Sequence, residues 1–301
     1  MALTLSNLPV AVIREVLDKL EPIDRLVIRK VSRNLRTVSD NTKFLLENVK
    51  ILISNELSTL KIGECNVEYS KEDKGTMLKC ITVEKSNYIS KCSQIKFIVN
   101  DFSTLMKISK PSLKHFTIRI SDDIKNKNRD QCFTRILNTL NSKSCLKVSN
   151  IEFGNLKPEE LAIVLPSFYA GHLEEIVICH CNLDYDLTGI VSLEQWKQAK
   201  YLDATWGWNS LPIEYLFHFV GFKINFKSFS LSDAIKIREV LEKTVNFQSG
   251  MFIFEETDIA DILEVFNPDY DDGNILPIYL NFNNSVFLIN ASRFHFEIKK
   301  K

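Results

Sequence analysis

From about residue 77 onward, short apolar runs with strand-like spacing alternate with amphipathic helical segments, and these runs share one frame. The clearest run, His172–Leu183, has apolar residues at Leu173, Ile176 and Ile178 and a cysteine at Cys181. The second and third anchors are two residues apart, so a strand places both on one face of a sheet. Such units must stack side by side, because one unit alone does not bury its apolar face.

The frame matches the leucine-rich-repeat pattern L-x-x-L-x-L-x-x-(N/C)-x-L, with Cys181 in the asparagine or cysteine slot. Looser versions begin at Leu78, Cys92, Leu113, Val148, Ala199, Phe219 and Ser249. Their spacing is irregular, but most intervals have room for a strand, a helix and two loops. The pattern therefore predicts an α/β fold with an irregular leucine-rich-repeat-like array of strands and helices.

The segments between these runs carry helix start signals. Pro158-Glu-Glu160 is typical of a first helical turn, Ser192-x-x-Gln195 has the pattern of a capping box, and residues 234–243 have helical apolar spacing. The end of the chain differs, since three strand-like runs follow one another at 276–282, 285–290 and 293–298. We expect these to pair as antiparallel strands that cap the last repeat and close its open edge.

The N-terminal residues 5 to 40 have a helical pattern. Pro9 suits a first helical turn, and Glu21-Pro22 interrupts the helix, because the residue before proline avoids helical angles. One wide apolar stripe lies between them: Val12, Ile13, Val16, Leu17 and Leu20. Helices this short do not stabilise themselves, so some of these side chains must face the rest of the protein, and others are available to a partner.

Leu8-Pro9, the stripe to Leu20, the break at Pro22 and Val31-Ser32-Arg33-Asn34-Leu35 occur together in the register of an F-box, which this segment resembles. In that family a three-helix unit docks onto the Skp-type adaptor of cullin-RING ubiquitin ligases, and the rest of the chain captures a substrate. Many F-boxes have an acidic residue where this chain has Val10-Ala11 and a tryptophan where it has Leu35, which removes aromatic contact area.

The remainder is similar to the FTH domain that follows the F-box in a large nematode family. Three segments carry this resemblance: Leu193-Glu-Gln-Trp-Lys-Gln-Ala199, Phe217-His-Phe-Val-Gly-Phe-Lys-Ile224 and Asp233–Leu241. The expected domains are an F-box at 1–45, connecting strands and first irregular repeats at 46–110, the FTH, leucine-rich-repeat-like domain at 111–265, and C-terminal antiparallel strands at 266–301.

The resemblance implies a substrate-recognition subunit of an SCF-type ubiquitin ligase that is not itself an enzyme. Its partners are a Skp-type adaptor, through it a cullin, and a protein substrate. The residues expected to form or support the adaptor-binding surface are Leu8, Pro9, Val12, Ile13, Val16, Leu17, Leu20, Leu26, Val31 and Leu35. The alternative reading is that this segment only caps the repeat array of a protein-binding scaffold with no ligase role.

Substrate binding is expected on the strand positions between the apolar anchors, because these positions face away from the core. By this register they are Lys96, Thr117, Arg119, Glu152, Val177, Asp203, Thr205 and Lys223. Trp206 and Trp208 lie at a predicted strand exit and join them as aromatic candidates, although packing against a following helix is the alternative. The mixture of charges argues against a nucleic-acid groove.

Composition limits the class of protein further. The 38 basic and 38 acidic residues cancel, so no net charge attracts nucleic acid or an acidic membrane surface. The 7 cysteines are irregularly spaced, which fits reduced thiols better than a disulfide framework. Neither a signal peptide nor an apolar run long enough to span a bilayer is found. We expect a cytoplasmic or nuclear protein.

The sequence offers little catalytic or metal-binding chemistry. Alternation along a strand puts Cys179 and Cys181 on the face opposite His180, and no second pair has zinc-finger spacing. The acidic run Asn267–Asn274 departs from a calcium loop, because its glycine is one residue late and Ile278 takes the place of the bidentate glutamate. We therefore expect no metal, no cofactor and no catalytic residues. An enzyme on an unrecognised α/β fold stays a third reading.

Overall fold

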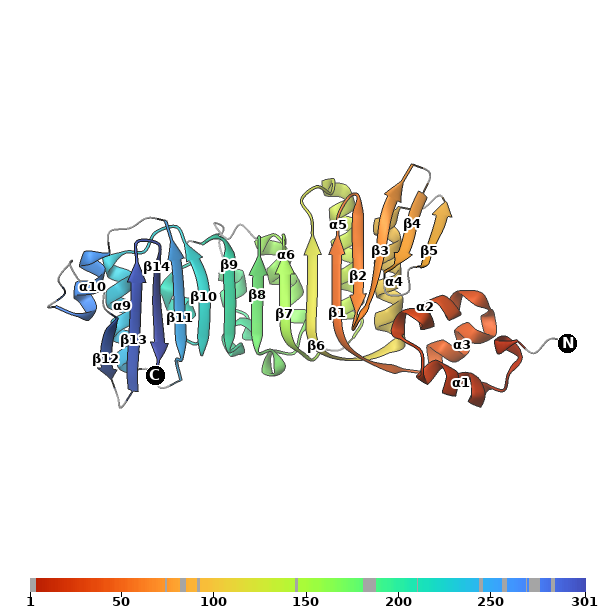
Figure 1. Ribbon diagram of the computed structural model, residues 1–301, viewed down its shortest axis with the longest axis horizontal. Coiled ribbons are helices and arrows are strands. Elements are labelled where there is room, and N and C mark those ends of the chain that lie inside the picture. The colour runs from red at the N-terminus through yellow and green to blue at the C-terminus, as the bar shows by residue number, and fades with distance from the viewer. Residues whose placement is uncertain are drawn as a thin grey trace. The chain divides into compact units, whose positions relative to one another are not determined.

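The computed structural model (Figure 1) describes residues 4–73, 75–81, 85–90, 93–143, 146–180, 188–209, 211–243, 246–255, 259–268, 270, 277–282 and 285–301. The chain divides into two compact units. The first comprises Met1–Ser149 with Ser167–Tyr169, and the second comprises Asn150–Pro166 with Ala170–Lys301.

The first unit begins with four short helical elements: η1 (Leu5–Asn7), α1 (Val10–Asp18), α2 (Pro22–Val31) and α3 (Arg33–Asn41). The predicted break is confirmed, since Pro22 is the first residue of α2. Ser32 lies between the two helices as the C-cap of α2 and the N-cap of α3, and its Oγ accepts a hydrogen bond from the Leu35 N–H at 3.1 Å. This serine cap supplies a partner for one of the first N–H groups of α3, where the chain turns between the two helices.

The sheet of the first unit consists of six strands: β1 (Phe44–Ile53), β2 (Leu57–Ile62), β3 (Cys65–Glu72), β4 (Gly75–Cys80), β5 (Lys85–Ser90) and β6 (Ser109–Ile120). The order is β6-β1-β2-β3-β4-β5, with β1 parallel to β6 and all other neighbours antiparallel. Helices α4 (Gln94–Ile108) and α5 (Asn126–Asn141) lie behind these strands in Figure 1. One sheet face is therefore covered by helices.

Helix α4 corrects the prediction of a strand-like repeat beginning at Cys92. The helix starts at Gln94, where the Ser93 Oγ accepts a hydrogen bond from the Lys96 N–H. Its buried apolar residues are Ile98, Val99, Phe102, Leu105, Met106 and Ile108. This spacing is the period of a helix, and it outweighs the shorter strand-like frame within the same residues.

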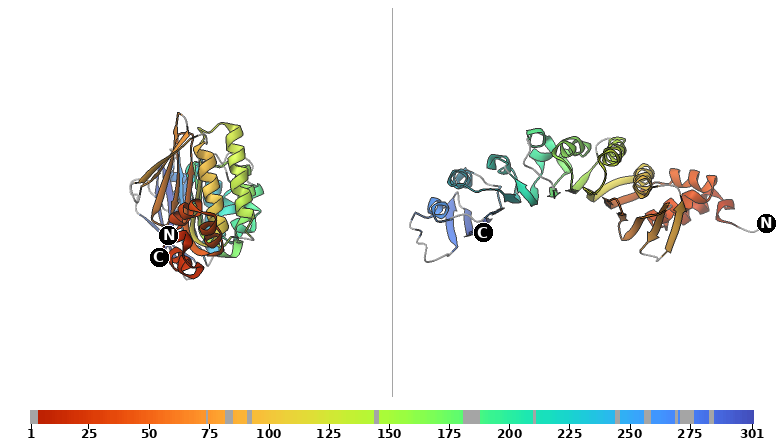
Figure 2. Two further views of the ribbon diagram at one scale, coloured as in Figure 1. Left: turned by 90° about the vertical axis from the view of Figure 1, so that its right-hand side faces the viewer. Right: turned by 90° about the horizontal axis from the view of Figure 1, so that it is seen from above.

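The second unit alternates strands and helices. Its parallel strands are β7 (Val148–Gly154), β8 (Glu175–Cys179), β9 (Tyr201–Asn209), β10 (Gly221–Phe226) and β11 (Ser249–Phe254), which are neighbours in that order. Between them run α6 (Pro158–Val164), η2 (Leu165–Ser167), η3 (Ala170–His172), α7 (Thr188–Val191), α8 (Glu194–Gln198), η4 (Ile213–Leu216) and α9 (Leu231–Lys243), and α10 (Ala260–Phe266) follows β11. In the view from above (Figure 2) the helices of this unit lie on one side of its strands.

The anchor positions of the sequence frame are buried on the helix-covered face. They are Ile151, Phe153, Ile176, Ile178, Leu202, Ala204, Phe222, Ile224, Phe252 and Phe254, and each exposes at most a few per cent of its surface. The residues between the two anchors of each strand are half-buried or exposed: Glu152, Val177, Asp203, Lys223 and Ile253. The predicted alternation is therefore confirmed for these five strands, and it decides which side chains remain available on the open face.

The helix starts in this unit agree with the prediction in one case and differ in another. Helix α6 begins at Pro158, and the Glu160 carboxylate accepts a hydrogen bond from the Lys157 N–H at 2.8 Å. Helix α8 begins at Glu194 with Leu193 as its N-cap, whereas the Ser192 hydroxyl donates to the Gly189 carbonyl. The capping box expected at Ser192 is wrong, because this hydroxyl closes the preceding turn instead.

The C-terminal strands pair as expected. They are β12 (Ile278–Phe282), β13 (Ser285–Ser292) and β14 (His295–Lys300), and they form an antiparallel series β12-β13-β14. Strand β14 pairs antiparallel with β11, for example Phe296 with Phe252. This pairing covers the edge that the last parallel strand leaves, which supplies partners for its backbone N–H and C=O groups.

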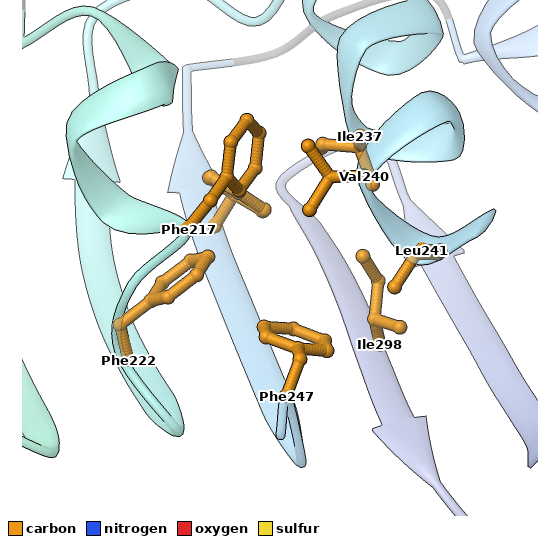
Figure 3. A pocket seen from close by; sticks show the side chains of 8 residues that line it. Phe217, Phe222, Ile237, Val240, Leu241, Phe247 and Ile298 are labelled. Atoms are coloured by element: carbon orange, nitrogen blue, oxygen red, sulfur yellow. The ribbon is translucent and has the colours of Figure 1, made fainter. Parts of the chain in front are cut away.

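An apolar cavity lies between α9 and the sheet of the second unit (Figure 3). It is lined by Phe217, Phe222, Ile237, Val240, Leu241, Phe247, Phe252 and Ile298, and the space that these outline, its solvent side included, is about 220 Å³. Phe222, Gly250 and Ile298 occupy one register row across β10, β11 and β14. The missing side chain at Gly250 is what leaves room for the rings of Phe222 and Phe247.

Candidate functional site

The three N-terminal helices enclose a small apolar interior of their own. Ile13 and Leu17 of α1 meet Leu35 and Val38 of α3, and all four are almost fully buried. Leu5, Leu8, Leu20 and Ile28 pack around this cluster and are partly buried. The interior of this helical unit is therefore complete without a partner chain.

The ten residues predicted for adaptor binding separate by burial. Ile13, Leu17, Leu26 and Leu35 are buried. Leu8, Val16 and Leu20 are half-buried, and Pro9, Val12 and Val31 are exposed. The four buried residues support the helices from inside and do not present a docking surface. Because Leu35 is 1% exposed, the absence of tryptophan at this position changes the packing of the interior and leaves the exterior as it is.

Two exposed valines were not among the predicted residues. Val10 of α1 is 47% exposed and Val27 of α2 is 57% exposed, beside Val12 at 40% and Val31 at 68%. Val27 and Val31 are one helical turn apart, so they share a face of α2. The sequence contained a signal for these residues, because both valines lie outside the apolar stripe of their helix. A helix that buries one face does not need apolar residues at such positions.

A buried arginine joins the helices to the start of the sheet. Arg25 is 3% exposed, and its guanidinium donates to the Thr42 carbonyl at 3.1 Å and to the Asp18 carboxylate at 3.3 Å. The same guanidinium lies over the Phe44 ring, 4.8 Å from its centroid. These contacts connect α1, the end of α3 and β1, so the helical unit continues into β1 without a linker.

A second polar connection joins α2 to the sheet and α4. The Lys30 ammonium lies 3.3 Å from Asp101 Oδ1, and the Tyr69 hydroxyl donates to Asp101 Oδ2 at 3.1 Å. Tyr69 is fully buried, and burial together with the neighbouring Asp101 charge raises the pKa of the phenol well above its ordinary value. The hydroxyl is therefore held as a neutral donor at physiological pH.

The residues predicted for substrate binding lie on both units. Thr117 and Arg119 are on β6 of the first unit, opposite Lys50 and Leu52 of β1. Lys96 is on α4, which covers the other side of that sheet, so its predicted place on a strand is wrong. The cause is the helical period of α4 described above.

In the second unit four of the predicted residues form one row across the open sheet face. Glu152 pairs with Val177, Val177 with Asp203, and Asp203 with Lys223. The row continues through Met251 and Glu297, which were not predicted. The sequence frame stops at β11, and only the antiparallel pairing of β14 brings Glu297 into this row.

Polar contacts hold side chains in place on this open face. The Asp203 carboxylate accepts hydrogen bonds from the Thr205 N–H at 3.2 Å and the Thr205 hydroxyl at 2.8 Å. Burial acts to raise the pKa of Glu297, but hydrogen bonds from Lys299 and Asn290 offset this effect, so its pKa lies below the ordinary value. Trp206 and Trp208 are on β9, and their side chains lie outside the described residues.

The described residues contain no group of three or more histidine, cysteine or carboxylate side chains placed to hold a metal ion. Strand β8 ends at Cys179, and His180 has a positive φ of 53°, so the expected strand stops before Cys181, which lies outside the described residues. The calcium-like run Asn267–Asn274 also lies largely outside them. The cavity of Figure 3 is lined by apolar side chains alone, which suits packing better than chemistry.

Within the described part of the chain, we find no helix that combines the length and the apolar character needed to cross a membrane.

Comparison with known proteins gives matches to two domain families and to a relative that aligns with most of the chain. Residues 5–47 match the F-box domain, and residues 130–269 match the FTH domain. The chain is 28% identical over 297 residues to F-box A protein 224 of Caenorhabditis elegans, an alignment that covers 96% of this chain and 77% of that protein. No solved structure matches the chain.

Proposed function

We propose that this chain, which carries an F-box domain and an FTH domain, is a substrate-recognition subunit of a cullin-RING (SCF-type) ubiquitin ligase. In this proposal the F-box binds a Skp-type adaptor and through it a cullin, and the sheet faces bind a protein substrate. Ubiquitin transfer is carried out by other subunits, so the chain acts by binding and not by catalysis.

The observation that carries the proposal is the set of exposed valines on an already closed helical unit. Val10, Val12, Val27 and Val31 are each 40% to 68% exposed, while Ile13, Leu17, Leu35 and Val38 complete the interior. Full burial of a valine contributes about 1.5 kcal/mol or more, so these half-exposed side chains supply a gross few kcal/mol on docking. Leu8 and Pro9, which precede α1, are further residues of the adaptor-binding surface in the proposal.

The substrate side of the proposal rests on the open sheet faces. We infer that the strand and helix array of the second unit is leucine-rich-repeat-like, because its apolar anchors are buried in register and its helices lie on one side. The proposed substrate-binding residues are Thr117, Arg119, Glu152, Val177, Asp203, Thr205, Trp206, Trp208 and Lys223. All nine lie on strands, which position side chains well for recognition.

The adaptor part is tested with the double variant Val27→Asp/Val31→Asp. Both side chains are exposed, so the fold should tolerate the change, whereas two charges on a docking surface are costly to desolvate. The matched control is Leu231→Asp/Ile235→Asp, an exposed pair one turn apart on α9 at 46% and 45% exposure. Co-purification with a Skp-type adaptor should be lost in the first variant and kept in the second. Equal capture by both variants contradicts the proposal.

A scaffold without a ligase role is the second candidate, and one observation favours it. The F-box helices pack against α4 through Lys30 and Asp101, as a segment that only caps a repeat array would do. Affinity capture of the full chain with adaptor and cullin separates the two functions. Recovery of both proteins supports the ligase role, and recovery of neither under conditions where a known F-box protein binds them supports the scaffold.

A further inference from the structure

The sheet of the first unit has one face that α4 and α5 do not cover (Figure 1). Along β1, Val49, Ile51 and Ile53 are buried toward the helices, while Lys50 and Leu52 alternate with them on the other face. The same alternation on β2 buries Leu60 and leaves Lys61 exposed. The open face of this sheet therefore presents lysines at its centre.

Two of these lysines are direct neighbours. Lys50 and Lys61 are paired positions in the antiparallel register of β1 and β2. Side chains in such pairs have Cβ atoms about 5 Å apart, and like charges directly opposite each other are destabilising. Among the described residues, the ion pairs of this unit involve other lysines, such as Lys71 with Glu56 and Lys114 with Glu47. The repulsion between the two ammonium groups is thus not offset by a carboxylate of the described residues.

Hydrogen-bonding groups lie on both sides of this lysine pair. Thr117 of β6 is opposite Lys50, and Asn66 of β3 is opposite Lys61, so the four side chains form one row. In the next row, Arg119 is opposite Leu52, and Glu68 lies between Thr59 and Lys79. Glu68 and Lys79 are paired positions of β3 and β4, whereas neither Lys50 nor Lys61 has a carboxylate directly opposite it.

We propose that this face binds an acidic, carboxylate-rich segment of a protein partner, with the Lys50 and Lys61 ammonium groups at its centre. The inference rests on the proposed role of the sheet in substrate capture and adds the chemistry of the segment. A partner carboxylate between the two lysines removes their mutual repulsion and gains two charge-assisted hydrogen bonds.

The arrangement suits several spaced carboxylates better than a single phosphate. Lysine is a flexible point charge, whereas dense, planar recognition of one phosphate favours the arginine fork. Neighbouring strands lie about 4.8 Å apart, so the lysines of β1 and β2 are spread along a line across the sheet. An extended segment with glutamate or aspartate side chains at similar intervals matches that line.

The test uses the full chain and a short fluorescein-labelled peptide of alternating glutamate and glycine. A peptide of alternating glutamine and glycine, a glycine-serine peptide with one phosphothreonine, and a single-stranded RNA of similar length are the comparison probes. Binding is measured by fluorescence anisotropy at low and at high salt. The acidic peptide should bind most tightly of the four probes, and its binding should weaken as salt is raised, because salt screens the attraction between exposed charges.

The variant is Lys50→Gln/Lys61→Gln, and the matched control is Lys125→Gln/Lys127→Gln, which removes two exposed lysines at the start of α5. The first variant loses two ion pairs with the peptide, so its affinity for the acidic peptide should be about tenfold lower. The affinity of the control should be unchanged. The acidic peptide should also raise the melting temperature of wild type but not of the first variant. Without peptide at low salt, the first variant should melt no lower than wild type, since it loses a repulsion.

Equal binding of the acidic peptide by wild type and the Lys50→Gln/Lys61→Gln variant overturns the inference, as does an equal loss in the control. Tighter binding of the phosphothreonine peptide or of RNA through the same lysines overturns the carboxylate assignment. Adaptor capture is measured on the same preparations. If capture persists while peptide binding fails, the inference alone is wrong; if capture fails while peptide binding persists, the ligase role is wrong.

Discussion

The Nζ atom of Lys30 in α2 lies 3.3 Å from Oδ1 of Asp101 in α4, although the two residues are 71 positions apart in the chain. The other Asp101 oxygen accepts a hydrogen bond from the hydroxyl of buried Tyr69. One carboxylate therefore joins an F-box helix, the sheet and the helix behind the sheet. This connection holds the F-box at a defined place within the first unit.

Replacement of Asp101 should weaken the first unit. Asp101→Asn removes the charge that pairs with Lys30 and weakens the acceptor for Tyr69, so we expect a loss of about 1 to 2 kcal/mol in the free energy of unfolding. Lys30→Gln should cost less than about 0.5 kcal/mol, because the Lys30 side chain is 54% exposed. Urea unfolding measures both. A larger loss in the lysine variant than in Asp101→Asn would contradict this account.

The buried phenol of Tyr69 predicts a loss of stability at alkaline pH. Burial and the Asp101 charge raise the pKa of Tyr69 in the folded protein above its unfolded value of about 10. The contribution of Tyr69 to the free energy of unfolding is therefore complete below about pH 10. It is lost as pH rises toward the pKa of the folded protein, because in this range the unfolded chain releases the phenol proton and the folded chain keeps it. Urea unfolding across this range should show a steeper decline for wild type than for Tyr69→Phe. Parallel declines would remove Tyr69 as the cause.

The Arg29 and Asp40 pair predicts an effect at acidic pH. A hydrogen bond from Arg29 lowers the pKa of the Asp40 carboxyl below its ordinary value, against a smaller opposing effect of burial. The pair, which links α2 to α3, therefore stabilises the protein above about pH 4 and loses its contribution as pH falls through the folded pKa. Asp40→Asn should cost about 1 kcal/mol at neutral pH and progressively less below pH 4. If the loss of stability caused by Asp40→Asn did not change with pH, it would come from altered packing and not from the ion pair.

Replacement of Leu35 should lower the stability of the F-box, because this side chain lies in its interior and not on the docking surface. Leu35→Ala leaves a cavity beside Ile13, Leu17 and Val38, and we expect a loss of about 3 kcal/mol in the free energy of unfolding. Leu35→Trp should cost about 1 to 3 kcal/mol through overpacking. Thermal unfolding with amide exchange along α1 and α3 measures the effect. A stable Leu35→Trp protein with stronger adaptor binding would show instead that this position reaches the surface.

Gly250 is predicted to tolerate no side chain. A Cβ atom there would lie 2.8 Å from Phe222 Cζ and 3.0 Å from Phe247 Cζ, so Gly250→Ala should destabilise the protein by about 1 to 3 kcal/mol. The matched control is Gly189→Ala in α7, where the added atom would meet only Ala162 at 3.7 Å. That change should be neutral or slightly stabilising because alanine favours a helix. If Gly250→Ala and Gly189→Ala changed the stability equally, the close contacts with Phe222 and Phe247 would not be the cause.

Sequence patterns predicted the parts of the fold that depend on neighbouring residues. Alternation identified the buried anchors of β7 to β11, Pro22 marked the start of α2, and the C-terminal runs form the expected antiparallel strands. The error at α4 arose because a frame of apolar residues with short gaps fits either a strand or a helix. Buried apolar residues over the whole of 94–108 resolve that ambiguity.

The candidate sites depended more on tertiary structure. The apolar stripe from Val12 to Leu20 predicted a helix with a buried face, but burial of Ile13 and Leu17 and exposure of Val10 and Val27 follow from how α1, α2 and α3 pack. Periodicity is a property of neighbouring residues, so it predicts which side chains share a face. Whether another element covers that face, and which distant charges meet across it, as Lys50 and Lys61 or Lys30 and Asp101 do, is decided only when the strands and helices pack together.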